Sequence, residues 1–197
     1  MTPFTVLTGL CLALDRANID TDQIIPARFL RKPRSAGYQN FLFHDMRRDA
    51  PAFPLNHAQP KILAAAENFG CGSSREGAVY ALVDSGIRCV IAPSFGDIFA
   101  GNSAKNGLLT VVLPTGTAAV LRAQVPGEMM VDLPAQTLRF PDGSEHRFEI
   151  DAFRKRCLLE GLDDIGLTLA HGAEIAAFQT ADAGRRPWAF PELTGVP

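Results

Sequence analysis

The chain has 197 residues, of which 47% are hydrophobic and 20% are charged, and its formal net charge at pH 7 is −2. This composition is typical of a globular protein of one domain, or of one domain with an extension, that buries a sizeable core. The nearly balanced charge argues against binding to nucleic acid or to an anionic membrane, and no apolar run reaches the roughly 18 residues that a membrane span needs.

The N-terminus and the cysteines favour a cytoplasmic protein. No basic leader precedes the apolar stretch at residues 4–14, so we expect no signal peptide. The cysteines lie far apart in the sequence and form no C-x-x-C pair: they are Cys11, Cys71, Cys89 and Cys157. We expect reduced and mostly buried thiols, and no zinc site or iron–sulfur cluster held by this chain alone. Cys71 stays open as a nucleophile if the fold brings a histidine to it.

The first 60 residues predict one clear strand region and much irregular structure. Residues 4–14 are typical of one or two strands, and residues 18–30 of a loop with a short turn, broken by Pro26. Residues 31–60 contain several prolines and show weak periodicity. We expect this stretch to be a long, partly ordered and mobile loop, because loops of such length are usually functional or disordered.

Regular alternation begins at residue 61. Strands and helices follow one another with short turns, at residues 61–69 (strand), 74–86 (helix), 87–93 (strand), 94–107 (helix with a serine cap and an Asn-Gly end) and 108–114 (strand). This order predicts an α/β fold with a parallel sheet flanked by helices, because parallel strands need a crossover connection.

After residue 114 the pattern changes. We expect a helix, three short strands of which the last two are joined by the turn PDGS, two helices and an irregular tail, at residues 115–125, 128–134, 136–140, 145–150, 151–161, 167–179 and 185–197. Asp151 is expected to cap the helix that follows it.

Residues 68–78, NFGCGSSREGA, are the strongest candidate for a functional site. A strand that ends in Gly-x-Gly and opens a helix lets the backbone approach a ligand, and the helix start offers N–H groups with partial positive charge. Ser73 and Ser74 add hydroxyl groups, and Arg75 adds a planar guanidinium that suits a carboxylate or a phosphate. The pattern therefore predicts a small-anion site at the carboxyl ends of the strands.

The same residues also fit a purely structural interpretation. Ser73 would cap the helix, and Glu76 three residues later would complete a capping box. The Gly-x-Gly lacks the third glycine of a dinucleotide fingerprint, and no Gly-Lys-Ser/Thr follows it as in a Walker loop. The spacing alone therefore leaves the capping box and the anion site open.

Four stretches of the chain resemble one protein family: residues 18–30, 67–76, 91–109 and 150–169. They are similar to the aconitase-type swivelling domain and, more closely, to the small subunits of 3-isopropylmalate dehydratases. The resemblance implies a swivelling β/β/α domain over residues 1–165, with a central mostly parallel sheet flanked by helices, plus C-terminal helices. Residues 166–197 would form a C-terminal helix and an irregular tail of the same domain.

Members of this family interconvert 2-isopropylmalate and 3-isopropylmalate in leucine biosynthesis by removing and re-adding water. The resemblance therefore implies a hydro-lyase that is active only with a separate large subunit, in a heterodimer or heterotetramer. That large subunit is expected to hold a [4Fe–4S] cluster whose iron acts as a Lewis acid on the substrate. This chain would bind no cofactor of its own, in agreement with the spacing of its cysteines.

The resemblance also implies roles for the residues of the turn. Ser73 matches the serine whose alkoxide removes a proton from carbon, and Arg75 matches the arginine that stabilises this oxyanion and the substrate charge. Ser74 matches a contact to a substrate carboxylate, and Gly72 is expected among the binding residues, because the glycine amides of the turn are donors. Thr21 and Asp22, from the first stretch, are expected beside the substrate, where they help to position the turn.

Residues 28–60 fall where the family keeps a mobile segment that selects substrates. Lys32 and Arg34 are candidates to bind the distal carboxylate of the diacid, and the alternative is that both are solvated surface cations. Three aromatic residues of this segment would line a pocket for the isopropyl group or belong to the core: Tyr38, Phe41 and Phe43.

The chain departs from the family pattern at three positions. Gly77 stands where the family usually has histidine, Ala104 where it usually has a bulkier residue, and Gly101 is also unusual. These departures keep two alternatives open. One is the small subunit of a related dehydratase for another diacid, such as a methylmalate, dimethylmalate or citraconate. The other is a diacid-binding module without catalysis.

Overall fold

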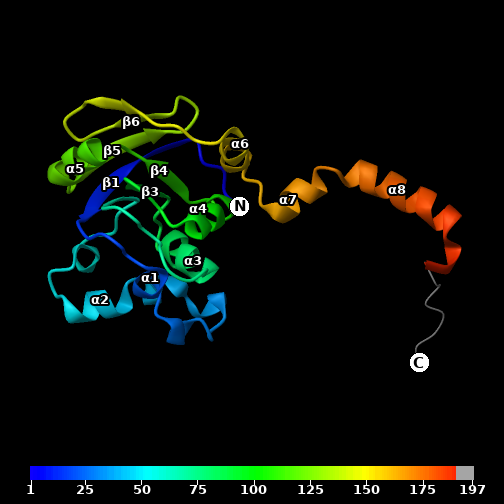
Figure 1. Ribbon diagram of the computed structural model, residues 1–197, viewed down its shortest axis with the longest axis horizontal. Helices are drawn as coiled ribbons and strands as arrows, with labels where there is room; N and C mark the ends of the chain where they lie inside the picture. The colour runs from blue at the N-terminus through cyan, green and yellow to red at the C-terminus, as the bar shows by residue number, and fades with distance from the viewer. Residues whose placement is uncertain (190–197) are drawn as a thin grey trace. The chain divides into compact units, whose positions relative to one another are not determined.

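The structure of the chain is a computed structural model that describes residues 1–189. The chain divides into two compact units, of which the first is Met1–Leu162 and the second begins at Asp163. The first unit contains the whole sheet and all the candidate site residues, and the described part of the second contains two α-helices (Figure 1).

A single seven-stranded sheet runs through the first unit, in the order β4-β3-β2-β1-β5-β6-β7. The strands are β1 (Val6–Leu14), β2 (Ile62–Ala65), β3 (Cys89–Ala92), β4 (Leu109–Val112), β5 (Gly127–Asp132), β6 (Thr137–Arg139) and β7 (Glu145–Arg147). Strands β1 to β4 pair in parallel, whereas β5 pairs antiparallel with β1 and continues antiparallel into β6 and β7. The predicted α/β fold with a parallel sheet is confirmed, and the local hairpins after residue 126 make the complete sheet mixed.

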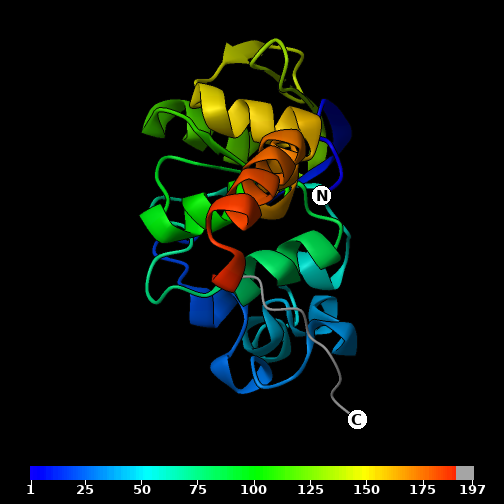
Figure 2. The same cartoon turned by 90° about the vertical axis from the view of Figure 1, so that its right-hand side faces the viewer.

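Two hydrophobic cores lie on the two faces of this sheet. In β2, Leu63 and Ala65 belong to one core and Ile62 and Ala64 to the other, because successive side chains of a strand point to opposite faces. Figure 1 shows α1, α2 and α3 below the strands of the sheet and α6 beside its upper part. In Figure 2 the blue and cyan short helices lie at the bottom, and the yellow-green strands of the sheet, which follow β5 in the chain, lie at the top.

Six helices complete the first unit, together with short 3-10 turns. They are α1 (Thr21–Ile24), α2 (His44–Asp49), α3 (Glu76–Asp84), α4 (Asp97–Lys105), α5 (Thr115–Gln124) and α6 (Ala152–Glu160). The predicted cap of α6 is confirmed, since Asp151 accepts a hydrogen bond from the N–H of Arg154. The predicted serine cap of α4 is wrong. Gly96 is the N-cap residue, and the hydroxyl oxygen of Ser94 accepts the N–H of Asn68 instead, at 2.8 Å.

The 28–60 segment is more structured than its sequence indicates. It contains α2 and four 3-10 helices, at Ala27–Phe29, Arg34–Ala36, Tyr38–Phe41 and Pro54–Asn56. Pro26 and Pro33 occupy the N-cap positions of two of these helices and Pro54 begins another, so the prolines start helices here. Single 3-10 turns give no 3.6-residue pattern, which explains why periodicity missed them. Mobility of the segment stays a prediction.

The second unit differs from the single helix predicted at residues 167–179. It contains α7 (Asp164–Leu169) and α8 (Gly172–Arg185), followed by a short 3-10 helix at Pro187–Ala189. Asp163 caps α7 by accepting the N–H of Gly166 at 2.7 Å. Most of the predicted irregular tail, residues 190–197, lies outside the described residues. In the described part of the chain, no helix combines the length and apolarity that crossing a membrane requires.

Candidate active site

The turn after β2 packs its backbone directly against the turn after β3. Gly70 has φ +74°, and a Cβ there would lie 2.2 Å from the ring of Phe99. A Cβ at Gly96 would lie 2.5 Å from the carbonyl oxygen of Gly70. The N–H of Gly96 donates to the carbonyl of Phe69 at 2.9 Å. Glycine is therefore required on both sides, by conformation at Gly70 and by close approach at Gly96.

Thr21 joins the start of α1 to this turn. Its Oγ1 donates to the carbonyl oxygen of Ser73 at 2.8 Å, and its N–H donates to the carbonyl of Cys71 at 3.0 Å. The side chain of Thr21 is buried, so water does not compete with these bonds. The structure thus brings Thr21 to the turn, as expected, across more than 50 residues of sequence.

Removal of this hydroxyl tests the contact. We expect Thr21→Val to lower the free energy of unfolding by about 1 kcal/mol, because the Ser73 carbonyl loses its donor while the shape of the side chain is nearly kept. Urea unfolding of the chain measures the change. Thr8→Val, whose side chain is exposed on β1, is the matched control and is expected to stay within about 0.5 kcal/mol of the wild type. Equal midpoints for the two variants would contradict the contact.

The start of α3 rules out the capping-box interpretation. Its N-cap residue is Arg75, two positions after Ser73, and within residues 1–189 no side chain caps this helix. Glu76 is the first helical residue, and its carboxylate accepts a hydrogen bond from Nδ2 of Asn106 at 2.8 Å, so it ties α3 to the end of α4. Ser73 and Ser74 are exposed. Their hydroxyl groups are thus available to a ligand.

An ion pair orients the guanidinium beside these serines. Nη1 of Arg75 donates to Oδ1 of Asp22, which lies on α1. The side chain of Arg75 is 19% exposed and that of Asp22 is 51% exposed, so the arginine is largely enclosed while its partner faces solvent. Arg75 uses only one of its guanidinium nitrogens to bind Asp22. Its other N–H donors can therefore bind an anion.

A cavity of about 230 Å³ opens at this place. Its lining residues come from α1 and from the two turns: Thr21, Gly70, Cys71, Gly72, Ser73, Arg75, Gly96, Asp97, Ile98 and Phe99. The N-termini of α3 and α4 both border it, and in the described part of the chain neither helix has a side-chain cap. Unpaired N–H groups and two helix dipoles favour negative charge here. The arrangement suits a small carboxylate ligand.

Lys32 and Arg34 lie outside this cavity, on the segment that packs against α3. Arg34 binds both oxygens of Asp84, at 2.6 and 3.0 Å, and its guanidinium carbon lies 4.1 Å from the ring centre of Tyr80. The ammonium of Lys32 lies 5.0 Å from the ring centre of Phe41 and is exposed. Both cations therefore already have partners within the chain.

The three aromatic residues considered for an isopropyl pocket belong to the core. Tyr38, Phe41 and Phe43 are all buried, and they pack with residues of α3 and β2 in one cluster. The core interpretation of these residues is therefore the correct one.

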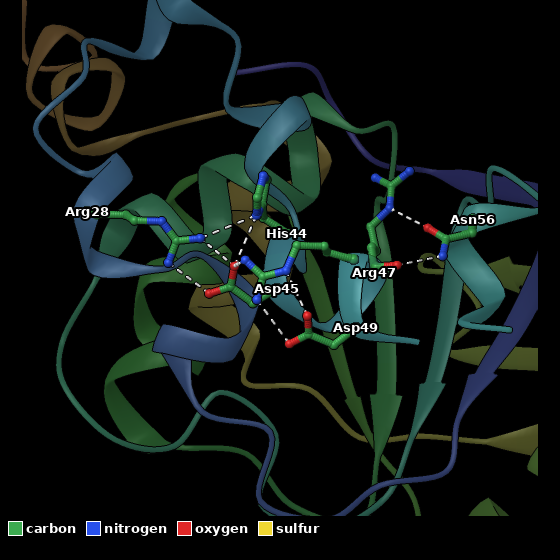
Figure 3. A network of polar contacts seen from close by, with 7 residues as sticks. Arg28, His44, Asp45, Arg47, Asp49 and Asn56 are labelled. Atoms are coloured by element: carbon green, nitrogen blue, oxygen red, sulfur yellow. Dashed lines mark hydrogen bonds and ion pairs between the residues drawn. The ribbon is translucent and has the colours of Figure 1, made fainter. Parts of the chain in front are cut away.

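A polar network that the sequence did not reveal fastens the start of the 28–60 segment to α2 (Figure 3). Arg28 binds both carboxylate oxygens of Asp45, and His44 Nδ1 lies 3.1 Å from Oδ1 of the same carboxylate. Arg48 is a further cation, 3.5 Å away. The hydrogen bonds from Arg28 and His44 hold the pKa of Asp45 well below its usual value. These groups are exposed, so the network orients the segment more than it stabilises the fold.

The cysteines divide into buried thiols and one accessible thiol. Cys11, Cys89 and Cys157 are buried, as predicted, whereas Cys71 is partly exposed in the site turn. Burial raises the pKa of Cys11 to about 12 and also raises that of Cys89. Among residues 1–189 no group of three or more His, Cys, Asp or Glu side chains could hold a metal ion. The cysteines of this part of the chain therefore do not fit an iron–sulfur cluster.

This division has a measurable consequence. At pH 8 we expect iodoacetamide to label Cys71 at least about tenfold faster than Cys11 or Cys89, because a buried thiol with a raised pKa carries almost no thiolate. Peptide mass spectrometry over a time course gives the rate at each position. Cys71→Ala provides the background rate, and the unfolded chain should label at all positions. Equal rates in the folded protein would contradict the burial.

Comparisons with known proteins identify the family. The model of the aconitase C-terminal domain matches residues 1–116, and the model described as LeuD_N matches residues 118–152. The model for the C-terminal domain of the 3-isopropylmalate dehydratase small subunit matches residues 164–192. The 3-isopropylmalate dehydratase small subunit of Xanthobacter autotrophicus is 48% identical over 200 residues, which cover 95% of this chain and 100% of that protein. The chain belongs to the family of 3-isopropylmalate dehydratase small subunits.

Two further relatives agree with this membership. The 3-isopropylmalate dehydratase small subunit of Saccharophagus degradans is 46% identical over 211 residues, covering 96% of this chain and 98% of that protein. The crystal structure of 3-isopropylmalate dehydratase from Methanocaldococcus jannaschii superimposes with a TM-score of 0.71 at 25% identity, covering 87% of this chain and 98% of that chain. The family predicted from the four stretches is confirmed, and membership among small subunits implies a large-subunit partner.

Proposed function

We propose that this chain supplies the catalytic base, Ser73, to a dehydratase that interconverts 2-isopropylmalate and 3-isopropylmalate. Family membership makes the chain a small subunit of a hydro-lyase of the 3-isopropylmalate dehydratase type, in leucine biosynthesis. One observation carries the assignment of the base. The hydroxyl group of Ser73 is exposed at an uncapped helix N-terminus, beside a guanidinium that Asp22 holds in place.

The chemistry requires a base that takes a proton from carbon. A serine hydroxyl is a weak acid, and its alkoxide forms only where preorganised donors stabilise the negative charge in a site closed to water. Arg75, the N–H groups at the start of α3 and the amide of Gly72 are such donors around Ser73. Ser73 Oγ accepts the proton during dehydration and returns it to carbon during rehydration, so the group is regenerated in each direction.

The remaining candidates bind the substrate. Ser74 is exposed next to the base, where its hydroxyl can donate to a substrate carboxylate. Thr21 and Asp22 hold the turn and the guanidinium, and Lys32 and Arg34 take the distal carboxylate from the neighbouring segment. To bind the carboxylate, Arg34 would have to break its ion pair with Asp84, whereas the ammonium of Lys32 would only have to leave the face of the Phe41 ring. Lys32 is therefore the stronger candidate of the two cations.

A large-subunit partner makes the enzyme complete. We propose a heterodimer or heterotetramer in the cytoplasm, in which this partner covers the cavity and holds a [4Fe–4S] cluster. When bound there, the cluster supplies a Lewis acid for the substrate hydroxyl and a carboxylate. The small subunit itself binds the diacid, excludes water from the base and moves the proton at Ser73.

A related alkylmalate is the second candidate substrate, favoured by Gly77. This residue lies in the first turn of α3, two positions after Arg75, so its departure from the family pattern is close to the site. Ala104 instead lines a second cavity, between α4 and α6, which shares Asp97 with the site cavity but includes no residue of the serine turn. Only the first of these departures therefore bears on the choice of substrate.

Reconstitution tests the function. The chain is mixed anaerobically with the cluster-bearing large subunit of the same genome, and absorbance of the unsaturated diacid is followed with isopropylmalates, methylmalate, dimethylmalate and citraconate. We expect turnover of 2- and 3-isopropylmalate. Turnover of another diacid alone would assign the chain to a related dehydratase. A complex that binds diacids without turnover would identify a binding module.

A further inference from the structure

Gly77 stands at a position where a side chain would fit only if neighbouring side chains moved. A Cβ at Gly77 would lie 2.7 Å from Cδ2 of Leu30 and 3.2 Å from Cε2 of Tyr38. Two residues of the 28–60 segment thus rest directly on the first turn of α3. Because α3 begins immediately after the serine turn, this contact is where the segment meets the candidate active site.

The residues that rest on Gly77 also hold Lys32. The hydroxyl of Tyr38 donates to the carbonyl oxygen of Lys32 at 3.0 Å, and its ring packs edge-on against Phe41, with centroids 6.1 Å apart. The Lys32 ammonium lies over this same Phe41 ring. Lys32 thus lies between Leu30 and Tyr38 in the sequence, and both of these residues pack against α3 at Gly77.

We propose that Gly77 is a positioning residue for Lys32 and so contributes to the recognition of the distal carboxylate of the diacid. It acts by being small. Leu30 and Tyr38 pack this closely against α3 because position 77 has no side chain. Their packing sets where the main chain of Lys32 lies relative to Ser73 and Arg75. The inference rests on the proposed function, in which Lys32 binds the distal carboxylate.

The predicted effect is on substrate binding rather than on chemistry. In the reconstituted complex, Gly77→Ala should raise KM for 3-isopropylmalate about five- to tenfold, because an overpacked contact displaces the segment. Its kcat should stay within roughly twofold, because the base and Arg75 are not moved. Gly101→Ala is the matched control. It also places alanine inside a nine-residue helix, α4, but its Cβ would meet no atom within 4 Å.

Two double-mutant cycles test the route of the effect. Leu30→Ala removes the methyl group that the new Cβ would strike, so Gly77→Ala should change KM much less in the Leu30→Ala background. Lys32→Met removes the ammonium and keeps the stem. If Gly77 acts through Lys32, then Gly77→Ala should add no further rise of KM to that of Lys32→Met.

The outcomes separate this inference from the proposed function. If Lys32→Met leaves KM unchanged, the role of Lys32 is wrong and the inference falls with it, although Ser73 as base is unaffected. If Lys32→Met raises KM but Gly77→Ala behaves as Gly101→Ala does, only the inference is overturned. Full additivity of Gly77→Ala with Lys32→Met would also overturn it. Elution of each variant as a complex on a sizing column, at the wild-type position, shows that assembly is intact.

Discussion

Ser73→Ala is expected to lower kcat of the reconstituted complex by about 10²–10⁴-fold, because the proton on carbon then has no positioned base. The substitution should leave the fold intact. Thr21 binds the carbonyl oxygen of Ser73 and not its hydroxyl, and the side chain of Ser73 is exposed, so alanine keeps the turn. Progress curves with 3-isopropylmalate, together with the unfolding midpoint of the variant, measure both quantities.

Ser74→Ala is the control for this experiment. Ser74 is a neighbouring exposed serine on the same turn, and its proposed role is to contact a substrate carboxylate. Its loss should therefore act mainly on KM, with kcat much less affected than in Ser73→Ala. If Ser74→Ala removed turnover and Ser73→Ala did not, the base would have to be reassigned to Ser74. Full activity in both variants would exclude a serine base.

Arg75→Lys is expected to lower kcat by about 10²–10³-fold although the positive charge is kept. A guanidinium presents several N–H donors in a fixed plane, so it can bind Asp22 and an oxyanion together, whereas an ammonium is a single flexible point charge. Steady-state kinetics of the complex measure the loss. KM should rise as well, because the same guanidinium lines the cavity in which we propose that the substrate carboxylate binds.

Asp22→Asn separates the donor role of Arg75 from its orientation. Asparagine keeps an oxygen acceptor in place of the carboxylate but removes the negative charge, so the guanidinium is held less firmly. The loss of kcat should be smaller than in Arg75→Lys, and the double variant should show little loss beyond that of Arg75→Lys alone. Wild-type kcat in Arg75→Lys would contradict the oxyanion role of this residue.

Much of the site could be predicted from local sequence. The Gly-x-Gly turn, the two serines and Arg75 lie within six residues, so their proximity is a property of the chain itself. The strand and helix alternation from residue 61 to residue 114 predicted β2, α3, β3, α4 and β4, because buried strands and amphipathic helices of ordinary length carry clear patterns. The family followed from four stretches, of which two lie in this region and two lie outside it, at residues 18–30 and 150–169.

Contacts across long stretches of sequence could not be predicted in this way. Glu76 was expected to complete a capping box with Ser73, but its carboxylate binds Asn106, thirty positions away. The 28–60 segment was expected to be a loop, because its 3-10 turns and its buried aromatic side chains leave no periodic signature. In both places tertiary packing decided between local options of similar energy.

The sequence by itself determined the family, the α/β alternation and the chemical groups available at the serine turn. These depend on neighbours in the chain and on the period of apolar residues. Only the tertiary structure decided that Thr21 bonds to Ser73, that Asp22 orients Arg75 and that Leu30 rests on Gly77. Each of these contacts joins residues about 50 positions apart, whose meeting depends on how the sheet and its connections pack and on no local spacing.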